Sequence, residues 1–160
     1  MQARQRNTER SPTCLLVASS GGHLHQLWEL REGWRREART WVTFDTPDVP
    51  EVLAGERVVY AHHPTNRNIP NLLRNAVLAI HVIRRERPGV IVTTGAGLAV
   101  PFAYAARLAG VPVIWVEGLG RVTDLSLSAR LVAPVASRLF VQWPELAARV
   151  EKAEYAGALW

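Results

Sequence analysis

Short apolar runs that alternate with glycine turns and helical patterns constrain the fold of this chain more than any other feature. The clearest run is Cys14–Ala18, which ends in the turn Ser19–His23 before a helical pattern begins. A second run, Val90–Thr93, ends in Thr94–Gly97 and is followed in the same way. Continuous apolar strands that alternate with helices are typical of a parallel sheet buried on both faces. The sequence therefore predicts an α/β, Rossmann-like domain with helices on both faces of a parallel sheet.

The spacing of apolar residues, glycines and prolines sets the bounds of the expected elements. Strands are expected at Cys14–Ala18, Arg39–Phe44, Arg57–Tyr60, Val90–Thr93, Val113–Val116 and, as the last one, Arg138–Val141. Helices are expected at His23–Arg36, Asn68–Arg87, Leu98–Ala109 and Leu125–Val135. In the second helix, Leu73, Ala76, Val77, Ile80 and Ile83 form one apolar face. The chain has 160 residues, room for one domain, which we place at 13–160 after a flexible basic tail at 1–12.

Charge and cysteine content limit the class of protein. The net charge of +5 suits an anionic partner such as a phosphorylated substrate, an acidic lipid surface or nucleic acid. Nucleic-acid binding is not expected, because basic and aromatic residues do not interleave. No stretch reaches the roughly eighteen uninterrupted apolar residues of a membrane span. Cys14 is the only cysteine, so an internal disulfide is excluded and a cytosolic location is expected.

The turn after the first strand carries the first candidate site residues. Gly21 and Gly22 let the backbone approach a ligand closely, and Ser20 adds a hydroxyl donor. His23 can act as a general base, because the unperturbed pKa of a histidine lies near neutrality. Alternatively, the glycines only shape the turn and His23 caps the helix. A dinucleotide site is a further alternative, since Asp45 ends the second strand, although the G-x-G-x-x-G spacing is missing.

Two further loops follow strands at the same expected edge of the sheet. Gly95, Ala96 and Gly97 form a candidate anion site, with close packing of strand and helix as the alternative reading. Glu117 ends the strand Val113–Val116, and Arg121 follows in a glycine-bearing loop. Such an arginine can hold a diphosphate through two parallel hydrogen bonds, whereas an exposed Glu–Arg pair would contribute little. Ligands bind at the carboxyl edge of an open sheet, so we expect one site there.

Six short segments, in order, carry a family resemblance that extends from about Cys14 to Trp160. They are Ser20–His23, Thr94–Gly97, Trp115–Glu117, Arg121–Ser128, Phe140–Pro144 and Tyr155–Gly157. In these segments the chain resembles the PssD-type polysaccharide biosynthesis proteins. Their eukaryotic relative is the membrane-recruiting subunit of the split enzyme that adds the second N-acetylglucosamine to dolichyl diphosphate. The resemblance implies the N-terminal, acceptor-side half of a GT-B glycosyltransferase.

The same resemblance implies a partner, substrates and residue roles. A second small chain would carry the donor-binding half and hold a UDP-sugar, and the acceptor would be a polyprenyl-diphosphate-linked saccharide of exopolysaccharide or capsule synthesis. The reaction would be inverting and would need neither metal nor cofactor. His23 would be the base, with Glu117 as the alternative base or the group that orients it. The acceptor and its diphosphate would contact Ser20, Gly21, Gly22, Gly95, Ala96, Gly97 and Arg121.

Attachment to the partner and to the membrane follows from the two ends of the chain. Trp143, Tyr155 and Trp160 are expected to dock the second chain, with local packing of the last helix as the alternative. An arginine-rich tail stands where many relatives have an apolar anchor helix. We therefore expect peripheral association with the inner face of the plasma membrane. Two other functions stay open, namely a non-catalytic scaffold that recruits the catalytic subunit to the membrane and a free-standing nucleotide-binding domain.

Overall fold

The computed structural model describes residues 13–159, and the predicted tail at 1–12 and Trp160 lie outside the described residues. Its sheet has seven strands in the order β3-β2-β1-β4-β5-β6-β7, and every neighbouring pair is parallel. The strands are β1 Cys14–Ala18, β2 Arg39–Phe44, β3 Val58–Ala61, β4 Val90–Gly95, β5 Val113–Val116, β6 Arg138–Val141 and β7 Ala153–Tyr155. The helices are α1 Gly22–Glu29, α2 Val49–Val52, α3 Ile69–Glu86, α4 Ala99–Leu108, α5 Leu127–Val132 and α6 Pro144–Arg149. This architecture confirms the predicted Rossmann-like fold.

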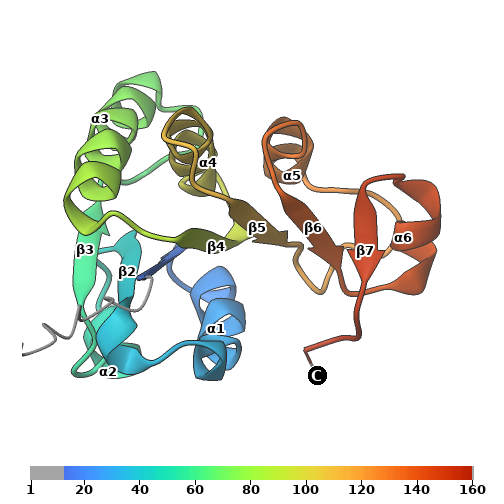
Figure 1. Cartoon of the computed structure of the whole chain (residues 1–160), viewed down its shortest axis with the longest axis horizontal. Helices are drawn as coiled ribbons and strands as arrows, with labels where there is room; N and C mark the ends of the chain where they lie inside the picture. Colours follow the sequence, from blue (N-terminus) through green and yellow to red (C-terminus); the bar gives the residue numbers. More distant parts are fainter. Residues whose placement is uncertain (1–12, 160) are drawn as a thin grey trace, which may run out of the picture.

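Helices cover both faces of the sheet, as Figure 1 shows, with α3, α4 and α5 on one side and α1 and α2 on the other. The central strand β1 is buried along its whole length. Leu15 and Val17 pack with the side chains of α3, α4 and α5. Leu16 and Ala18 point the opposite way and pack with Leu24 and other residues of α1 and α2. Because successive side chains of a strand alternate between faces, one short apolar run supports both layers.

The first helix is shorter than its apolar spacing predicts. It ends at Glu29 instead of Arg36, and two 3₁₀ turns, Arg31–Gly33 and Arg36–Ala38, lead into β2. The guanidinium of Arg39 donates to the backbone carbonyls of Arg31 at 2.7 Å and Trp34 at 3.1 Å. In a continuing helix these carbonyls would accept bonds from backbone N–H groups one turn later. The apolar spacing of Leu27, Leu30 and Trp34 contains no information on these side-chain bonds, so the end predicted from it was wrong.

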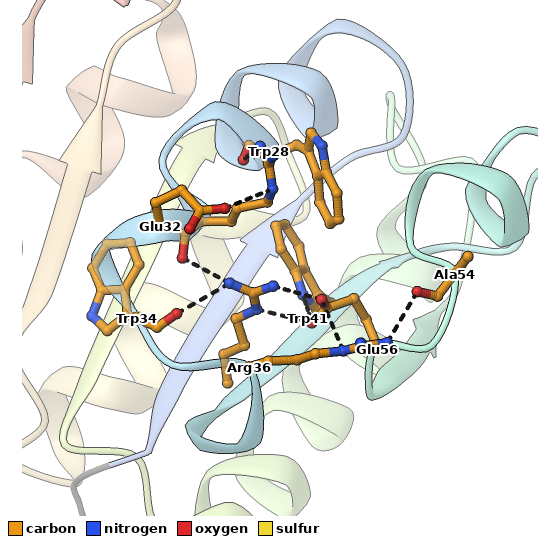
Figure 2. A network of polar contacts seen from close by, with 9 residues as sticks. Trp28, Glu32, Trp34, Arg36, Trp41, Ala54 and Glu56 are labelled. Carbon is orange, nitrogen blue, oxygen red and sulfur yellow. Dashed lines mark hydrogen bonds and ion pairs between the residues drawn. The ribbon is translucent and has the colours of Figure 1, made fainter.

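A buried ion pair fixes this corner of the molecule (Figure 2). The Glu56 carboxylate accepts from Arg39 at 2.9 Å and 2.6 Å and from Nε1 of Trp41 at 2.9 Å. The Glu56 side chain is only 3% exposed, and these hydrogen bonds hold the pKa of its carboxyl below the ordinary value. The network ties the start of β2 to the segment before β3 and lies away from the loops at the carboxyl edge of the sheet.

Three elements were missed and others were displaced. Helices α2 and α6 and strand β7 were not predicted, and Arg138–Val141 is therefore not the last strand. β7 has only three residues, too few to show an alternation of apolar and polar side chains in the sequence. Its position depends on pairing with β6 and on the Arg138–Glu154 ion pair. The third strand begins one residue later than predicted, and α5 covers only six residues of the helix expected at Leu125–Val135.

The apolar face predicted for the long helix points mainly away from the sheet. Leu73 is 63% exposed and Val77 69% exposed, whereas Asn71 and Asn75 are buried. The Asn75 amide accepts from the backbone N–H of His62 at 2.9 Å and donates to its carbonyl at 2.8 Å. Nδ2 of Asn71 donates to the carbonyl of Pro64 at 2.9 Å. These bonds fix the rotation of α3, which apolar periodicity alone misjudged.

Candidate functional site

A cleft of about 970 Å³ lies at the carboxyl edge of the sheet. Its walls come from the loops that follow β1, β3, β4 and β5, together with the first turns of α1 and α5. The sequence-predicted site residues that line it are Gly22, His23, Ala96, Gly97, Glu117 and Arg121. Ser20, Gly21 and Gly95 do not line it but lie within two residues of others that do. The topology therefore brings the three predicted loops together at one site.

His23 is held in one orientation by the strand beside it. Its Nδ1 lies 2.9 Å from the carbonyl oxygen of Thr94, and the Thr94 hydroxyl donates back to the His23 carbonyl at 2.5 Å. A carbonyl can only accept, so Nδ1 carries a proton, and in the neutral ring Nε2 is the nitrogen with the lone pair. Within residues 13–159, no hydrogen bond to Nε2 of His23 is found. The imidazole is therefore arranged to accept a proton from a molecule bound in the cleft.

The amino end of α1 offers unpaired backbone donors next to that imidazole. Gly21 caps the helix with a φ of 78°, a left-handed value that favours glycine, and no side chain caps the helix. The first α-helical bond runs from His25 to the Gly21 carbonyl, which leaves the N–H groups of Gly22 and His23 without helical partners. The first turn holds no acidic side chain. This end of α1 suits an anion, and the Asp48 carboxylate already interacts with the Gly21 N–H there, so a ligand would meet the N–H groups of Gly22 and His23.

The turn after β4 combines a packing role with a place in the cleft wall. Gly95 has a φ of 110°, and a Cβ there would come within 2.9 Å of Cζ2 of Trp115, so close packing requires this glycine. Ala96 lines the cleft with a φ of 67°, which is uncommon for a residue with a side chain. Strained backbone of this kind clusters at binding sites. Gly97 also lines the cleft, and a Cβ at this position would contact the side chain of Thr65 in the loop before α3.

Glu117 organises the loop after β5. Its Oε1 accepts from the backbone N–H of Gly118 at 2.8 Å. Its Oε2 accepts from the N–H of Ser126 at 2.9 Å and from the Ser126 hydroxyl at 3.0 Å. The residue is 2% exposed, and within the described chain no hydrogen bond joins it to His23. With both carboxylate oxygens engaged, Glu117 is suited to hold the loop in shape rather than to remove a proton.

Arg121 stands at the tip of that loop. It is exposed, its backbone N–H donates to the Gly118 carbonyl at 3.0 Å, and no ion pair of its guanidinium is found among residues 13–159. The surface Glu117–Arg121 pair considered above is therefore not formed. Nε1 of Trp143 donates to the Leu119 carbonyl at 2.6 Å and supports the loop from behind. Arg121 thus lines the cleft, and its guanidinium has no ion-pair partner in the part of the chain that the structure describes.

Two of the predicted docking residues belong to the last two strands, since Trp143 follows β6 and Tyr155 ends β7. Trp143 is partly buried through its contact with the Leu119 loop, whereas Tyr155 is 48% exposed, and Trp160 lies outside the described residues. A separate, mostly apolar groove of about 320 Å³ runs between Trp34, Phe140 and the segment Ala156–Leu159. Gln142 connects this segment to the cleft, since it donates to the Glu117 carbonyl at 3.0 Å and accepts from Leu159 at 3.0 Å.

Several cleft residues were not among the predicted site residues. Gln26 lies three residues after His23, a spacing that places both on one side of α1 and could have indicated it. Ser126 and Ser128 belong to the segment that carries the family resemblance, and Ser126 also caps α5 through its hydroxyl at 3.1 Å from the Ala129 N–H. Asn66 enters the wall from the loop before α3, for which the sequence gives no signal. Asp45 does not line the cleft.

Among residues 13–159, no group of three or more His, Cys, Asp or Glu side chains is placed to hold a metal ion. In the same part of the chain, no helix has both the length and the apolar character required to cross a membrane.

Solved structures share this fold. Acinetobacter baumannii MurG matches with a TM-score of 0.73 and 16% identity over 90% of this chain and 45% of its own. The S. aureus MnaA structure with UDP matches with a TM-score of 0.74 and 15% identity over 93% of this chain and 46% of its own. At these identities the likeness concerns the fold alone. The chain spans less than half of each structure.

Two relatives found by sequence similarity, one fungal and one human, carry the same name. The protein named UDP-N-acetylglucosamine transferase subunit ALG14 is 27% identical in Yarrowia lipolytica over 93% of this chain and 82% of the relative. The human protein of that name is 26% identical over 93% of this chain and 83% of the relative. The family described as "Oligosaccharide biosynthesis protein Alg14 like" matches residues 52–159, which is more than half of the sequence. The chain therefore belongs to the Alg14-like family of oligosaccharide biosynthesis proteins.

Proposed function

We propose that this chain is the acceptor-binding subunit of a two-chain glycosyltransferase of the PssD type. The enzyme transfers a sugar from a UDP-sugar to a polyprenyl-diphosphate-linked saccharide during exopolysaccharide or capsule assembly. Membership of the Alg14-like family supports this, because the named relatives are transferase subunits. That these relatives are named subunits also supports a second chain, which would carry the donor-binding half.

The observation that carries the proposal is the orientation of His23. Its Nδ1 is bonded to Thr94, so Nε2 is available to remove the proton from the acceptor hydroxyl. The acceptor oxygen then attacks the anomeric carbon, the bond from that carbon to UDP breaks, and UDP leaves with the electron pair. The configuration at the anomeric carbon is inverted. The open end of α1 and the Arg121 guanidinium bind the acceptor diphosphate.

Glu117 has a positioning role in this proposal. Its carboxylate fixes Gly118 and Ser126, and the loop between them carries Arg121. The groove beside Ala156–Leu159 and the exposed Tyr155 form the docking surface for the second chain. Gln142 connects that surface to the Glu117 loop, so docking of the partner is coupled to the shape of the acceptor site.

The test is a reconstituted pair of chains with His23→Ala. Loss of a positioned base lowers kcat by about a hundredfold to ten-thousandfold. His62→Ala is the matched control, because Asn75 holds the backbone of His62 and the His62 side chain is exposed. Turnover close to that of the wild type in the His23 variant would show that His23 is not the base.

The second candidate function is a non-catalytic scaffold that recruits the catalytic subunit to the membrane. The packing role of Gly95 favours it, because that glycine is required by Trp115 whether or not a ligand binds. The two functions differ in what cleft variants do. If His23→Ala and Arg121→Ala still form the complex but abolish transfer, the scaffold alternative is excluded. If they leave transfer unchanged, the scaffold function is favoured.

A further inference from the structure

The most unusual surface of the described chain is an apolar stripe on α3, which we call the α3 face. Its members, each between 41% and 69% exposed, are Ile69, Leu72, Leu73, Val77 and Ile80. At about 100° per residue, these positions fall within an arc of roughly 140° of the helix surface. Contiguous exposed apolar side chains on one helix are typical of an interaction site rather than of a solvated surface.

The α3 face is exposed because specific bonds turn it outward. The opposite side of α3 is anchored by Asn71 and Asn75, whose side chains make three hydrogen bonds to the backbone of His62 and Pro64. Rolling the helix to bury the α3 face would break these bonds and leave buried backbone groups unpaired. The orientation of α3 is therefore built into the fold.

Cations border the α3 face. Arg74, Arg84 and Arg85 are exposed on α3. The only acidic residue of the helix, Glu86, is turned aside, since its side chain is 8% exposed and pairs with Arg57 at 2.6 Å. An apolar stripe beside basic side chains complements a bilayer with anionic headgroups, where apolar groups enter the interface and cations contact phosphates.

The α3 face also lies next to the cleft. Asn66 lines the cleft, Asn68 caps α3, and Ile69 opens both the helix and the α3 face. Figure 1 shows α3 as the outermost helix of its layer, beside α4. We propose that the α3 face lies in the surface of a bilayer that contains anionic phospholipids, so that the cleft opens at that surface. There a lipid-linked acceptor enters the cleft from the bilayer, with its diphosphate at the open end of α1 and Arg121 and its hydroxyl at His23. Only this last step rests on the proposed function.

A labelling experiment on the full-length chain tests the contact. Cys14 is 1% exposed and burial raises the pKa of its thiol to about 12, so it does not compete for labelling. Leu73→Cys and Val77→Cys, labelled with a polarity-sensitive fluorophore, are mixed with phosphatidylcholine vesicles with and without phosphatidylglycerol. We expect a blue shift, and quenching by lipid-borne nitroxide, on the anionic vesicles. Leu131→Cys on α5 is the matched control, because Leu131 is also exposed and α4 lies between α3 and α5, and it should show neither.

Charge substitutions give a second readout. Leu73→Glu and Val77→Glu should each weaken binding to the anionic vesicles about fivefold, because an apolar group is lost and a carboxylate is added. Leu131→Glu should leave binding unchanged, and equal thermal unfolding of all variants shows that they remain folded.

Three results would overturn the proposal. One is equal vesicle binding by all variants, and another is vesicle binding without a signal at positions 73 and 77. The third is loss of binding to the second chain instead of to vesicles, which would make the α3 face a protein interface. None of these measurements needs sugar transfer, so an inactive reconstituted pair would contradict the proposed function without affecting this inference.

Discussion

Glu117→Gln distinguishes a catalytic base from a residue that shapes the acceptor site. The substitution keeps the size of the side chain but replaces one acceptor oxygen with an NH₂ donor. In the protein, Oε1 faces one backbone N–H, from Gly118, and Oε2 faces another, from Ser126. Whichever way the amide is turned, one buried N–H then meets a donor instead of an acceptor.

The size of the effect follows from these contacts. An unpaired buried donor costs about 1–3 kcal/mol, and hydrogen bonds to a charged group are stronger than those to a neutral amide. The Ser126 hydroxyl can rotate and recover its own bond, so we expect a total loss of about 2–3 kcal/mol in the free energy of unfolding. For a chain of this size that corresponds to a fall in Tm of roughly 4–12 °C.

Thermal and urea unfolding of the isolated chain measure this change without the second chain or any substrate. Glu151→Gln is the control, because Glu151 is exposed and the substitution removes one negative charge in the same way. If Glu117→Gln unfolds at the same temperature as the wild type yet abolishes transfer in the reconstituted pair, the positioning role is wrong. Glu117 would then be the better candidate for the base.

Two further predictions concern stability. Glu56→Gln leaves the buried Arg39 charge without its carboxylate and should cost about 3 kcal/mol in urea unfolding at neutral pH. The folded-state pKa of Glu56 lies below its unfolded value, so its contribution is present above about pH 5 and is lost as pH falls through the folded pKa. The variant should therefore lose less stability than the wild type on acidification, and parallel profiles would contradict this account. Gly95→Ala should lower Tm, because its Cβ would meet Trp115 at 2.9 Å in a strained backbone, whereas an unchanged Tm would show that the turn can relax.

The apolar runs and glycine turns were sufficient to predict the strands β1 to β6 and the helices α1, α3, α4 and α5 in outline. The run Cys14–Ala18 is buried on both faces, so its composition alone marks it as a strand of a covered parallel sheet. Elements held by their neighbours were not predictable. β7 exists because it pairs with β6, and α1 ends early because Arg39 takes the carbonyls of Arg31 and Trp34.

The candidate site divides in the same way. The sequence by itself determined which loops meet, because parallel strands place all their carboxyl ends at one edge and so bring His23 and Glu117 into one cleft. Only the tertiary structure decided what these side chains can do, since hydrogen bonds to Thr94 and Ser126 set the tautomer of one and engage the carboxylate of the other. It also decided which side of α3 meets the solvent. Periodicity places residues on a shared face but does not orient that face, and the bonds of Asn71 and Asn75 do so here.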